Sequence, residues 1–342
     1  MTDADRTPSP ASPAQPYASL HPEVILDAVE GVGFSCDGRL FALNSFENRV
    51  YQVGVVDGDP LVAKFYRPGR WSEPALLEEH AFAQALARRE IPVVAPIADA
   101  QGATLHAHGG FRFALYPRCP GRAPELDDPE TLRWMGRFIG RIHAVGALEP
   151  FTHRPSLDLR TFGEEPSQFL LAHDFLPADL RATYESVVAD VLERVRRCYA
   201  RTGPVRVIRL HGDCHPGNIL WSEGGPHFVD LDDARMGPAV QDLWMLLSGQ
   251  RDEMSAQLDA IIEGYRLFYD FDPTELQLIE PLRTLRMIHY AGWLARRWAD
   301  PAFPANFPWF NTQHYWQDHI LALREQAALL DEPPLALGVL GR

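Results

Sequence analysis

Three polar side chains near the middle of the chain have the types and the spacing that a phosphoryl-transfer site needs. Asp213 and Asn218 stand in one short segment as Asp-x-x-x-x-Asn, and Asp230 ends the next apolar stretch. A hydroxyl that attacks the terminal phosphorus of a nucleotide needs a carboxylate to orient it and a cation to balance the phosphate oxygens. Mg²⁺ prefers oxygen ligands, which amides and carboxylates supply. The segment therefore predicts phosphoryl transfer.

The elements around these side chains favour a built site. Residues 212–217 contain small and turn-forming residues that allow a tight loop, and residues 218–221 and the run ending at Asp230 have the composition of two short strands joined by a turn. Taken singly, an Asp or Asn in a loop can serve only to bind backbone groups. A zinc site at Cys214 and His215 is disfavoured because adjacent soft ligands lack the paired spacing of such sites.

The first part of the chain predicts a small sheet lobe. Strand patterns are found at residues 39–43, 49–55, 61–66, 95–98 and 111–116. Residues 72–90 have helical spacing, with Ser72 as the expected N-cap. We therefore expect a five-stranded antiparallel sheet that carries one inserted helix.

The rest of the chain predicts a larger, mainly helical lobe. Helical patterns are found at residues 129–145, 178–199, 241–247, 254–269 and 280–298. The fold class expected is α+β, with two lobes. The expected segments are a disordered leader at 1–20, an ATP-binding lobe at 21–116, a hinge at 117–121, a catalytic lobe at 122–335 and a tail at 336–342.

Lys64 lies on an otherwise apolar strand of the small lobe, and Glu79 lies on the helix that follows. A buried or cleft-facing ammonium needs a negative partner, and Glu79 is the natural candidate. The alternative is a lysine near a strand end that reaches solvent. The loop at residues 43–49, between the first two strands, contains no glycine, but its backbone N–H groups and the Ser45 hydroxyl could bind phosphate.

Composition limits the class of protein. The chain has 342 residues, 46% of them hydrophobic, and its 32 basic and 46 acidic residues leave a formal net charge of −14. This charge argues against nucleic-acid binding. No run is long and apolar enough for a membrane span, no signal sequence is recognisable, and the four cysteines are scattered. We expect a cytoplasmic monomer with reduced thiols.

The motif His-Gly-Asp-x-His-x-Gly-Asn at residues 211–218 resembles the catalytic loop of the aminoglycoside phosphotransferase and choline kinase family, in which His-Gly-Asp stands where protein kinases have His-Arg-Asp. Within this family, the chain looks most like bacterial stress-response kinases. The resemblance is carried by residues 43–52, 62–68, 228–235, 237–247 and 297–304. It implies a two-lobed protein-kinase-like fold and an ATP- and Mg²⁺-dependent serine/threonine protein kinase concerned with survival under stress.

Carried over residue by residue, the resemblance implies the roles of the central segment. Asp213 would accept the proton, Asn218 and Asp230 would bind Mg²⁺, and Asp213 and Asp230 would be the catalytic carboxylates. His211 and Asp242 would support the loop from behind. The chain departs from ordinary protein kinases because Leu-Asp rather than Phe-Gly follows Asp230, which argues against switching by a long activation loop.

The same resemblance implies that Lys64 and Glu79 anchor the ATP phosphates and that Ser45 contacts ATP. The acceptor is left open. Arginine and aromatic residues crowd residues 283–303, which would suit an acidic acceptor, although the aromatic residues could equally form a core face. A small-molecule hydroxyl kinase and a nucleotide-binding regulator without catalysis stay as the alternatives.

Overall fold

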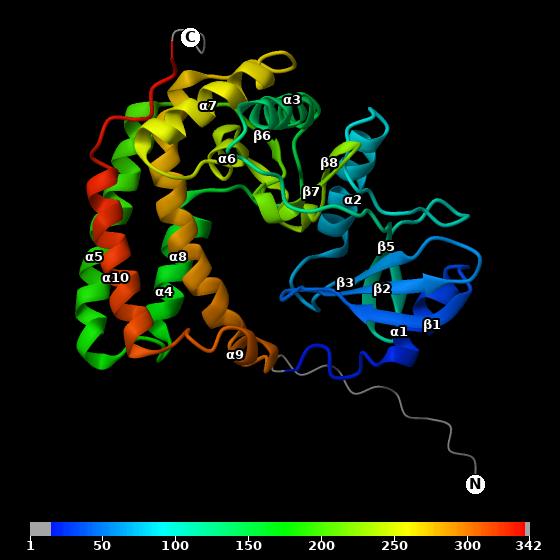
Figure 1. Ribbon diagram of the computed structural model, residues 1–342. Coiled ribbons are helices and arrows are strands. Elements are labelled where there is room, and N and C mark those ends of the chain that lie inside the picture. Colours follow the sequence, from blue (N-terminus) through cyan, green and yellow to red (C-terminus); the bar gives the residue numbers. More distant parts are fainter. Residues whose placement is uncertain (1–14, 339–342) are drawn as a thin grey trace.

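The computed structural model describes residues 15–338 and has two lobes, shown in Figure 1. The two-lobed α+β fold predicted from the sequence is confirmed. The smaller lobe consists of α1 (Pro22–Gly31), β1 (Cys36–Ala42), β2 (Arg49–Val55), β3 (Leu61–Phe65), α2 (Glu73–Ala87), β4 (His106–His108) and β5 (Phe111–Pro117). The chain then crosses once into the larger lobe.

The sheet of the smaller lobe is antiparallel, in the order β1-β2-β3-β5-β4. Its central strand, β3, carries Lys64, which is paired with Val50 on β2 and Ala114 on β5. A lysine held between two neighbouring strands cannot shift along the sheet without breaking the register. After β3, Ser72 caps α2 as expected, because its hydroxyl accepts from Ala75 N at 3.3 Å.

The prediction of a strand at residues 95–98 was wrong. Residues 95–98 are irregular, and the fourth strand of the sheet is β4, at His106–His108. The backbone bonds in and just before this segment are divided between the lobes: Ile97 N–H donates to Leu115 O, whereas Val94 N–H donates to Phe228 O of the larger lobe. An apolar extended segment between two partners cannot be told from a strand by its composition.

The larger lobe contains long helices and two small hairpins. Its helices are α3 (Pro129–Gly146), α4 (Glu165–Ala172), α5 (Ala178–Thr202), α6 (Val240–Trp244), α7 (Arg251–Tyr265), α8 (Ile279–Arg297), α9 (Ala302–Asn306) and α10 (Gln313–Leu329). The strand pair β6 (Val207–Leu210) with β9 (Arg235–Pro238) and the pair β7 (Ile219–Ser222) with β8 (Gly225–Phe228) lie among them. Within residues 15–338, none of the helices has the length and apolarity that crossing a membrane requires.

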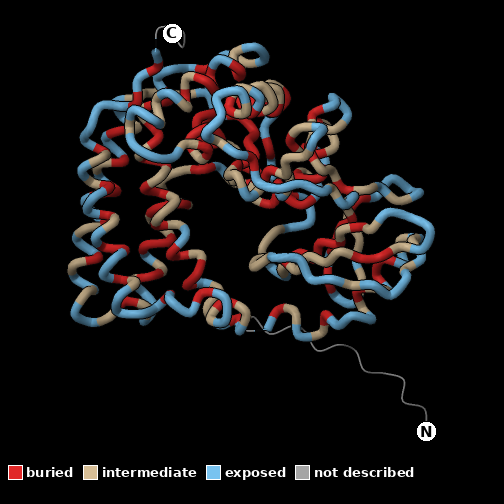
Figure 2. The backbone as a smooth tube through the Cα atoms, viewed as in Figure 1, coloured by how far each residue is buried: buried red, intermediate tan, exposed pale blue. Residues whose placement is uncertain are grey.

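Each lobe has its own apolar core, seen as buried segments in Figure 2. The sheet and α1 enclose the smaller core. Phe82 and Leu86 of α2, however, belong to the core of the larger lobe. The helix that carries Glu79 is therefore packed on the catalytic lobe and not only on its own sheet, which fixes its position relative to the catalytic loop.

The folded chain begins before His21. Residues 1–14 of the predicted leader lie outside the described residues, but Tyr17 stacks on Phe111 with ring centroids 5.9 Å apart, and Leu20 is buried. Apolar contacts therefore order the segment that the sequence assigned to the end of a disordered leader. At the other end, Leu337 is buried, so the described part of the expected tail packs on the larger lobe.

Candidate active site

The loop at residues 211–218 follows β6, and the carboxylate of Asp242 holds its backbone. Gly212 has φ +84°, and a Cβ there would lie 2.2 Å from the carbonyl oxygen of Asp233, so only glycine fits. The buried carboxylate of Asp242, on α6, accepts from the N–H groups of His211 at 2.8 Å and Gly212 at 2.9 Å. Two charge-assisted bonds thus fix the backbone next to Asp213.

Asp213 has polar neighbours near both of its carboxylate oxygens. Asn218 Nδ2 lies 3.3 Å from Oδ2, His215 Nε2 lies 3.4 Å from the same oxygen, and Arg286 Nη1 lies 2.7 Å from Oδ1. Burial favours a raised pKa for Asp213, but the hydrogen bond from His215 and the charge of Arg286 lower it to about 2. The group is therefore a carboxylate at neutral pH.

The hairpin β7–β8 brings Asp230 towards this loop. Its register continues past the strands, because Val229 N–H donates to Asn218 O at 3.0 Å and the imidazole Nε2 of His211 lies 2.9 Å from Val229 O. Asp230 itself has the left-handed backbone conformation, with φ 59° and ψ 65°. This uncommon conformation turns the chain sharply after the strand, and the Asp230 side chain is left 53% exposed.

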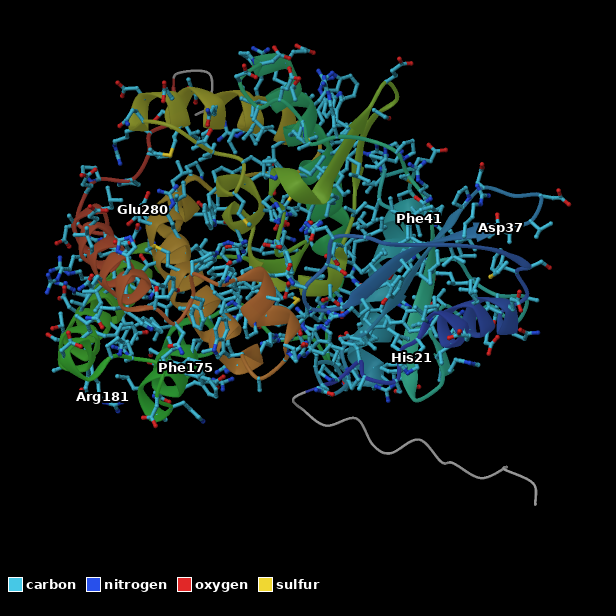
Figure 3. All side chains as sticks on the ribbon, turned by 60° about the horizontal axis from the view of Figure 1, so that its bottom comes forward. His21, Asp37, Phe41, Phe175, Arg181 and Glu280 are labelled. Carbon is cyan, nitrogen blue, oxygen red and sulfur yellow. The ribbon has the colours of Figure 1, made fainter. Side chains whose placement is uncertain are left out.

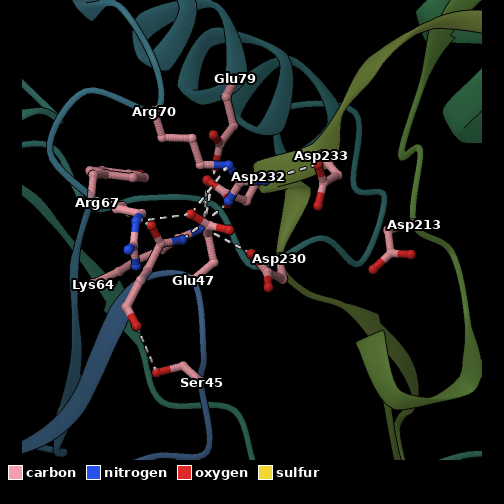
Figure 4. A network of polar contacts seen from close by, with 12 residues as sticks. Ser45, Glu47, Lys64, Arg67, Arg70, Glu79, Asp213, Asp230, Asp232 and Asp233 are labelled. Atoms are coloured by element: carbon pink, nitrogen blue, oxygen red, sulfur yellow. Dashed lines mark hydrogen bonds and ion pairs between the residues drawn. The ribbon is translucent and has the colours of Figure 1, made fainter. Parts of the chain in front are cut away.

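Lys64 is the centre of a buried acidic network, shown in Figure 4. Its Nζ lies 2.8 Å from Asp230, 3.5 Å from Asp232 and 3.7 Å from Glu79. The predicted pair with Glu79 is present, but Asp230 is the closer partner. Burial alone lowers the pKa of Lys64, and the three carboxylates more than offset this, so that its pKa lies well above the ordinary value.

Asp232 joins the two lobes, although the sequence did not single it out. It is buried, and it accepts from Arg70 on the segment after β3 and from Asn48 Nδ2 at 3.0 Å. Arg70 also donates to Asp233 at 2.9 Å. One guanidinium from the smaller lobe therefore binds two neighbouring carboxylates of the larger lobe, next to the turn that carries Asp230.

Two glutamates anchor α2 to the larger lobe. Glu78 accepts from the three consecutive backbone N–H groups of residues 152–154 at 2.6 to 3.0 Å. Glu79 pairs with Arg154 at 3.2 Å as well as with Lys64. Because both glutamates are bound, a movement of α2 away from the site would break several charge-assisted bonds at once.

The loop between β1 and β2 is fastened to α8 on the side of the site opposite the chain crossing. Glu47 Oε2 accepts from Trp293 Nε1 at 2.6 Å and from the guanidinium of Arg297. Figure 3 shows α9 and the end of α8 next to the sheet lobe, with side chains filling the space between them. The Ser45 hydroxyl lies 3.2 Å from Asn48 O and accepts from Val50 N, so its contacts close its own turn. Its contact with ATP stays a prediction.

Further contacts join the smaller lobe to the region that follows α8. Arg67, just after β3, donates to Asp300 at 2.9 Å, and the ring of Phe46 packs on Phe307 with centroids 4.8 Å apart. The two lobes are therefore joined at both sides of the site, by the chain on one side and by ion pairs and aromatic contacts on the other. We refer to Glu47, Trp293, Arg297, Arg67 and Asp300 as the inter-lobe clamp.

Glu47→Gln tests the clamp. We expect it to lower the free energy of unfolding by about 2 kcal/mol, because the variant leaves the guanidinium of Arg297 without its carboxylate at a largely buried position. Chemical denaturation monitored by tryptophan fluorescence measures this. The matched control is Glu73→Gln, whose exposed pair with Arg112 contributes within about 0.5 kcal/mol. Equal effects of the two changes would show that the clamp does not hold the lobes.

The donor set near Asp213 suits a hard cation. Asn218 directs Nδ2 to Asp213, which leaves its amide oxygen available, and Asp230 is half-exposed. Both supply oxygen, as Mg²⁺ requires. Among the described residues no group of three or more His, Cys, Asp or Glu side chains forms a closed metal site.

The sequence missed the arginines of the site. Arg70 and Arg154 bind the acidic groups around Lys64, yet neither has a nearby motif that would point to it. Asp232 could have been suspected from Asp230-Leu-Asp-Asp233, which is rich in carboxylates. Arg286 was noticed only as one of many basic residues on its helix.

Comparisons with known proteins show what the chain is similar to. The model of the phosphotransferase enzyme family matches residues 40–279. Stress response kinase A of Escherichia coli (strain K12) is 47% identical over 321 residues, which cover 94% of this chain and 97% of that protein. The serine/threonine protein kinase RdoA of Salmonella typhimurium (strain LT2) shows the same identity and the same coverage.

Among solved structures, amicoumacin kinase hAmiN in complex with AMP-PNP, Ca²⁺ and Ami has a TM-score of 0.69 at 18% identity, and the match covers 90% of this chain and 93% of that one. A microcompartment-associated aminopropanol kinase has a TM-score of 0.67 at 16% identity, over 89% of this chain and 95% of that one. At these identities the likeness concerns the fold.

Proposed function

Because the chain belongs to the phosphotransferase enzyme family, we propose that it is an ATP- and Mg²⁺-dependent serine/threonine protein kinase that acts in the bacterial stress response. The observation that carries the proposal is the 47% identity, over 94% of the chain, to proteins named as such kinases. We further propose that the chain acts in the cytoplasm, as a monomer.

In this proposal Asp213 receives the acceptor hydroxyl. With a pKa of about 2, the carboxylate is too weak a base to remove the proton before the reaction. It instead accepts a hydrogen bond that aims the oxygen at phosphorus, and it takes the proton as the new P–O bond forms. The bonds from Asp242 to the loop backbone support this role, because they hold Asp213 in place.

Lys64 and the groups around it would receive the nucleotide. Its ammonium is buried and is held by Glu79 and Asp230, so it would meet the phosphates without first being ordered. Asn218 and Asp230 would hold Mg²⁺, which supplies charge neutralisation at the phosphate oxygens. Asp230 would then exchange part of its contact with Lys64 for that cation.

The test of this function is transfer of labelled terminal phosphate from Mg-ATP to a generic Ser/Thr protein substrate and to the kinase itself. Label on serine or threonine is the expected result. ATP consumption that requires an added metabolite, with no label on protein, would assign the chain to small-molecule hydroxyl kinases. Nucleotide binding without any transfer would assign it to regulators.

A further inference from the structure

Arg286, on α8, lies directly beside the proposed base. Its Nη1 is 2.7 Å from Asp213 Oδ1, and its side chain is 39% exposed. Within residues 15–338, Asp213 is the only carboxylate at ion-pair distance from this guanidinium. Asp213 must turn towards an acceptor hydroxyl during the reaction, so the partner of Arg286 is a group that the reaction itself engages.

Two other arginines of α8, Arg283 and Arg297, differ in this respect, because each pairs with a carboxylate that has no part in the proposed transfer. Arg283, three residues earlier on the same helix, pairs with Glu280 at 3.0 Å. Arg297 pairs with Glu47 at the inter-lobe clamp. Arg286 therefore stands out as the exposed cation at the place where the acceptor arrives.

Asp213 and Arg286 together can bind two polar groups of one acceptor once the Asp213 carboxylate turns towards it. Oδ1 of Asp213 is buried and has no well-aligned hydrogen bond within the described residues, although Arg286 lies close to it. This oxygen can accept the acceptor hydroxyl. The guanidinium of Arg286 has five N–H donors in a plane, and one nitrogen faces Asp213, so the others can bind an anion next to that hydroxyl.

We propose that Arg286 selects acceptors in which an anionic group, a carboxylate or a phosphate, flanks the hydroxyl to be phosphorylated. This inference rests on the proposed kinase function and adds the chemical class of its acceptor. Consecutive Cα atoms are about 3.8 Å apart, so a residue adjacent to the acceptor serine or threonine can reach a guanidinium beside Asp213. Planar, paired donors suit the two oxygens of a carboxylate or phosphate.

The net negative charge of the chain opposes the binding of an acidic acceptor unless a local cation attracts it. A net charge of −14 repels acidic peptides at long range, so an acidic preference requires a local cation. Tyr290, one helical turn beyond Arg286, is 40% exposed and stacks on Trp293 with centroids 5.6 Å apart. It places an aromatic surface next to the guanidinium, where the main chain of a peptide could pack.

The test uses serine peptides that are identical except that both flanking residues are Asp, Asn or Lys. For the wild type we expect kcat/KM to be about 10-fold higher for the Asp peptide than for the Asn peptide, because a charge-assisted bond to Arg286 forms only with the former. A fourth peptide, with phosphoserine at the flanks, separates a phosphate preference from a carboxylate preference. We expect Arg286→Gln to remove the acidic preference and Arg286→Glu to reverse it in favour of Lys.

The matched control is Arg283→Gln, which makes the same change on the same helix and should keep the acidic preference. Arg286→Lys keeps the charge without the paired donors, and we expect it to keep a weaker acidic preference. If Arg286→Gln fails to fold, Arg286→Lys replaces it as the test variant. Equal rates of the wild type on the flanking variants would overturn the inference. So would an Arg286→Gln enzyme that is slowed equally on all of them, because Arg286 would then only position Asp213. Absence of wild-type transfer to any peptide or protein would instead contradict the proposed function.

Discussion

Replacing Asp213 by Asn is expected to lower kcat for phosphate transfer by about 10³-fold while ATP still binds with nearly unchanged affinity. The amide keeps the size of the side chain but cannot take the proton of the acceptor hydroxyl. ATP binding should survive because Asp213 lies apart from the network around Lys64, as Figure 4 shows. Single-turnover transfer and equilibrium titration with ATP measure the two effects separately.

The exposed residue Asp174 provides the control for this prediction. Asp174→Asn makes the same chemical change on the surface of the larger lobe and should leave transfer at the wild-type rate. An Asp213→Asn enzyme that keeps more than about a tenth of wild-type kcat would show that Asp213 is not the proton acceptor. Loss of ATP affinity in that variant would show instead that the loop holds the nucleotide.

The ionisation of Asp213 gives a second readout of the same assignment. Because its pKa is lowered to about 2, the carboxylate is already charged throughout the range from pH 5 to 8. Its titration therefore contributes no fall in kcat/KM as the pH drops towards 5, whereas an unperturbed carboxylate would begin to contribute one.

The sequence predicted those features that depend on residues close together along the chain. Ser72 caps the helix that follows it, and the hairpin β7–β8 forms where the turn residues are found. Lys64 and Glu79 could be matched because the pattern around each is local and the family resemblance supplies the pairing. Alternation predicted the longer strands of the sheet, but it placed the fourth strand at residues 95–98 and did not predict the short strands β4, β6 and β9.

The features that the sequence did not predict arise between distant segments. Asn48 meets Asp232, and Glu47 meets Arg297, only after the lobes have come together. No sequence pattern indicates that such residues pair, because the segment around each partner has the composition of an ordinary surface loop or helix. The same reason applies to the closest partner of Lys64: Asp230 reaches it only because its left-handed backbone turns the side chain towards β3.

Replacing Lys64 by Met is expected to weaken ATP binding by 10- to 100-fold, on the order of the 1.5–3 kcal/mol that a hydrogen bond to a charged group contributes. It should also lower the free energy of unfolding by about 3 kcal/mol, because the ammonium holds three carboxylates in a buried network. The loss of stability should not exceed this value, because Glu79 keeps Arg154 and Asp232 keeps Arg70 as partners. ATP titration measures the affinity, and chemical denaturation measures the free energy of unfolding.

The comparison of Lys64→Met with Lys64→Arg separates the nucleotide role from the structural one. Arginine restores the charge, so the carboxylates keep a cation and most of the stability should return. Its larger, planar group cannot reproduce the position of the ammonium among Glu79, Asp230 and Asp232, so ATP affinity should stay low. If Lys64→Arg recovered stability and ATP affinity together, any buried cation would suffice at this position. If Lys64→Met bound ATP as tightly as the wild type, Lys64 would serve only to neutralise Asp230, Asp232 and Glu79.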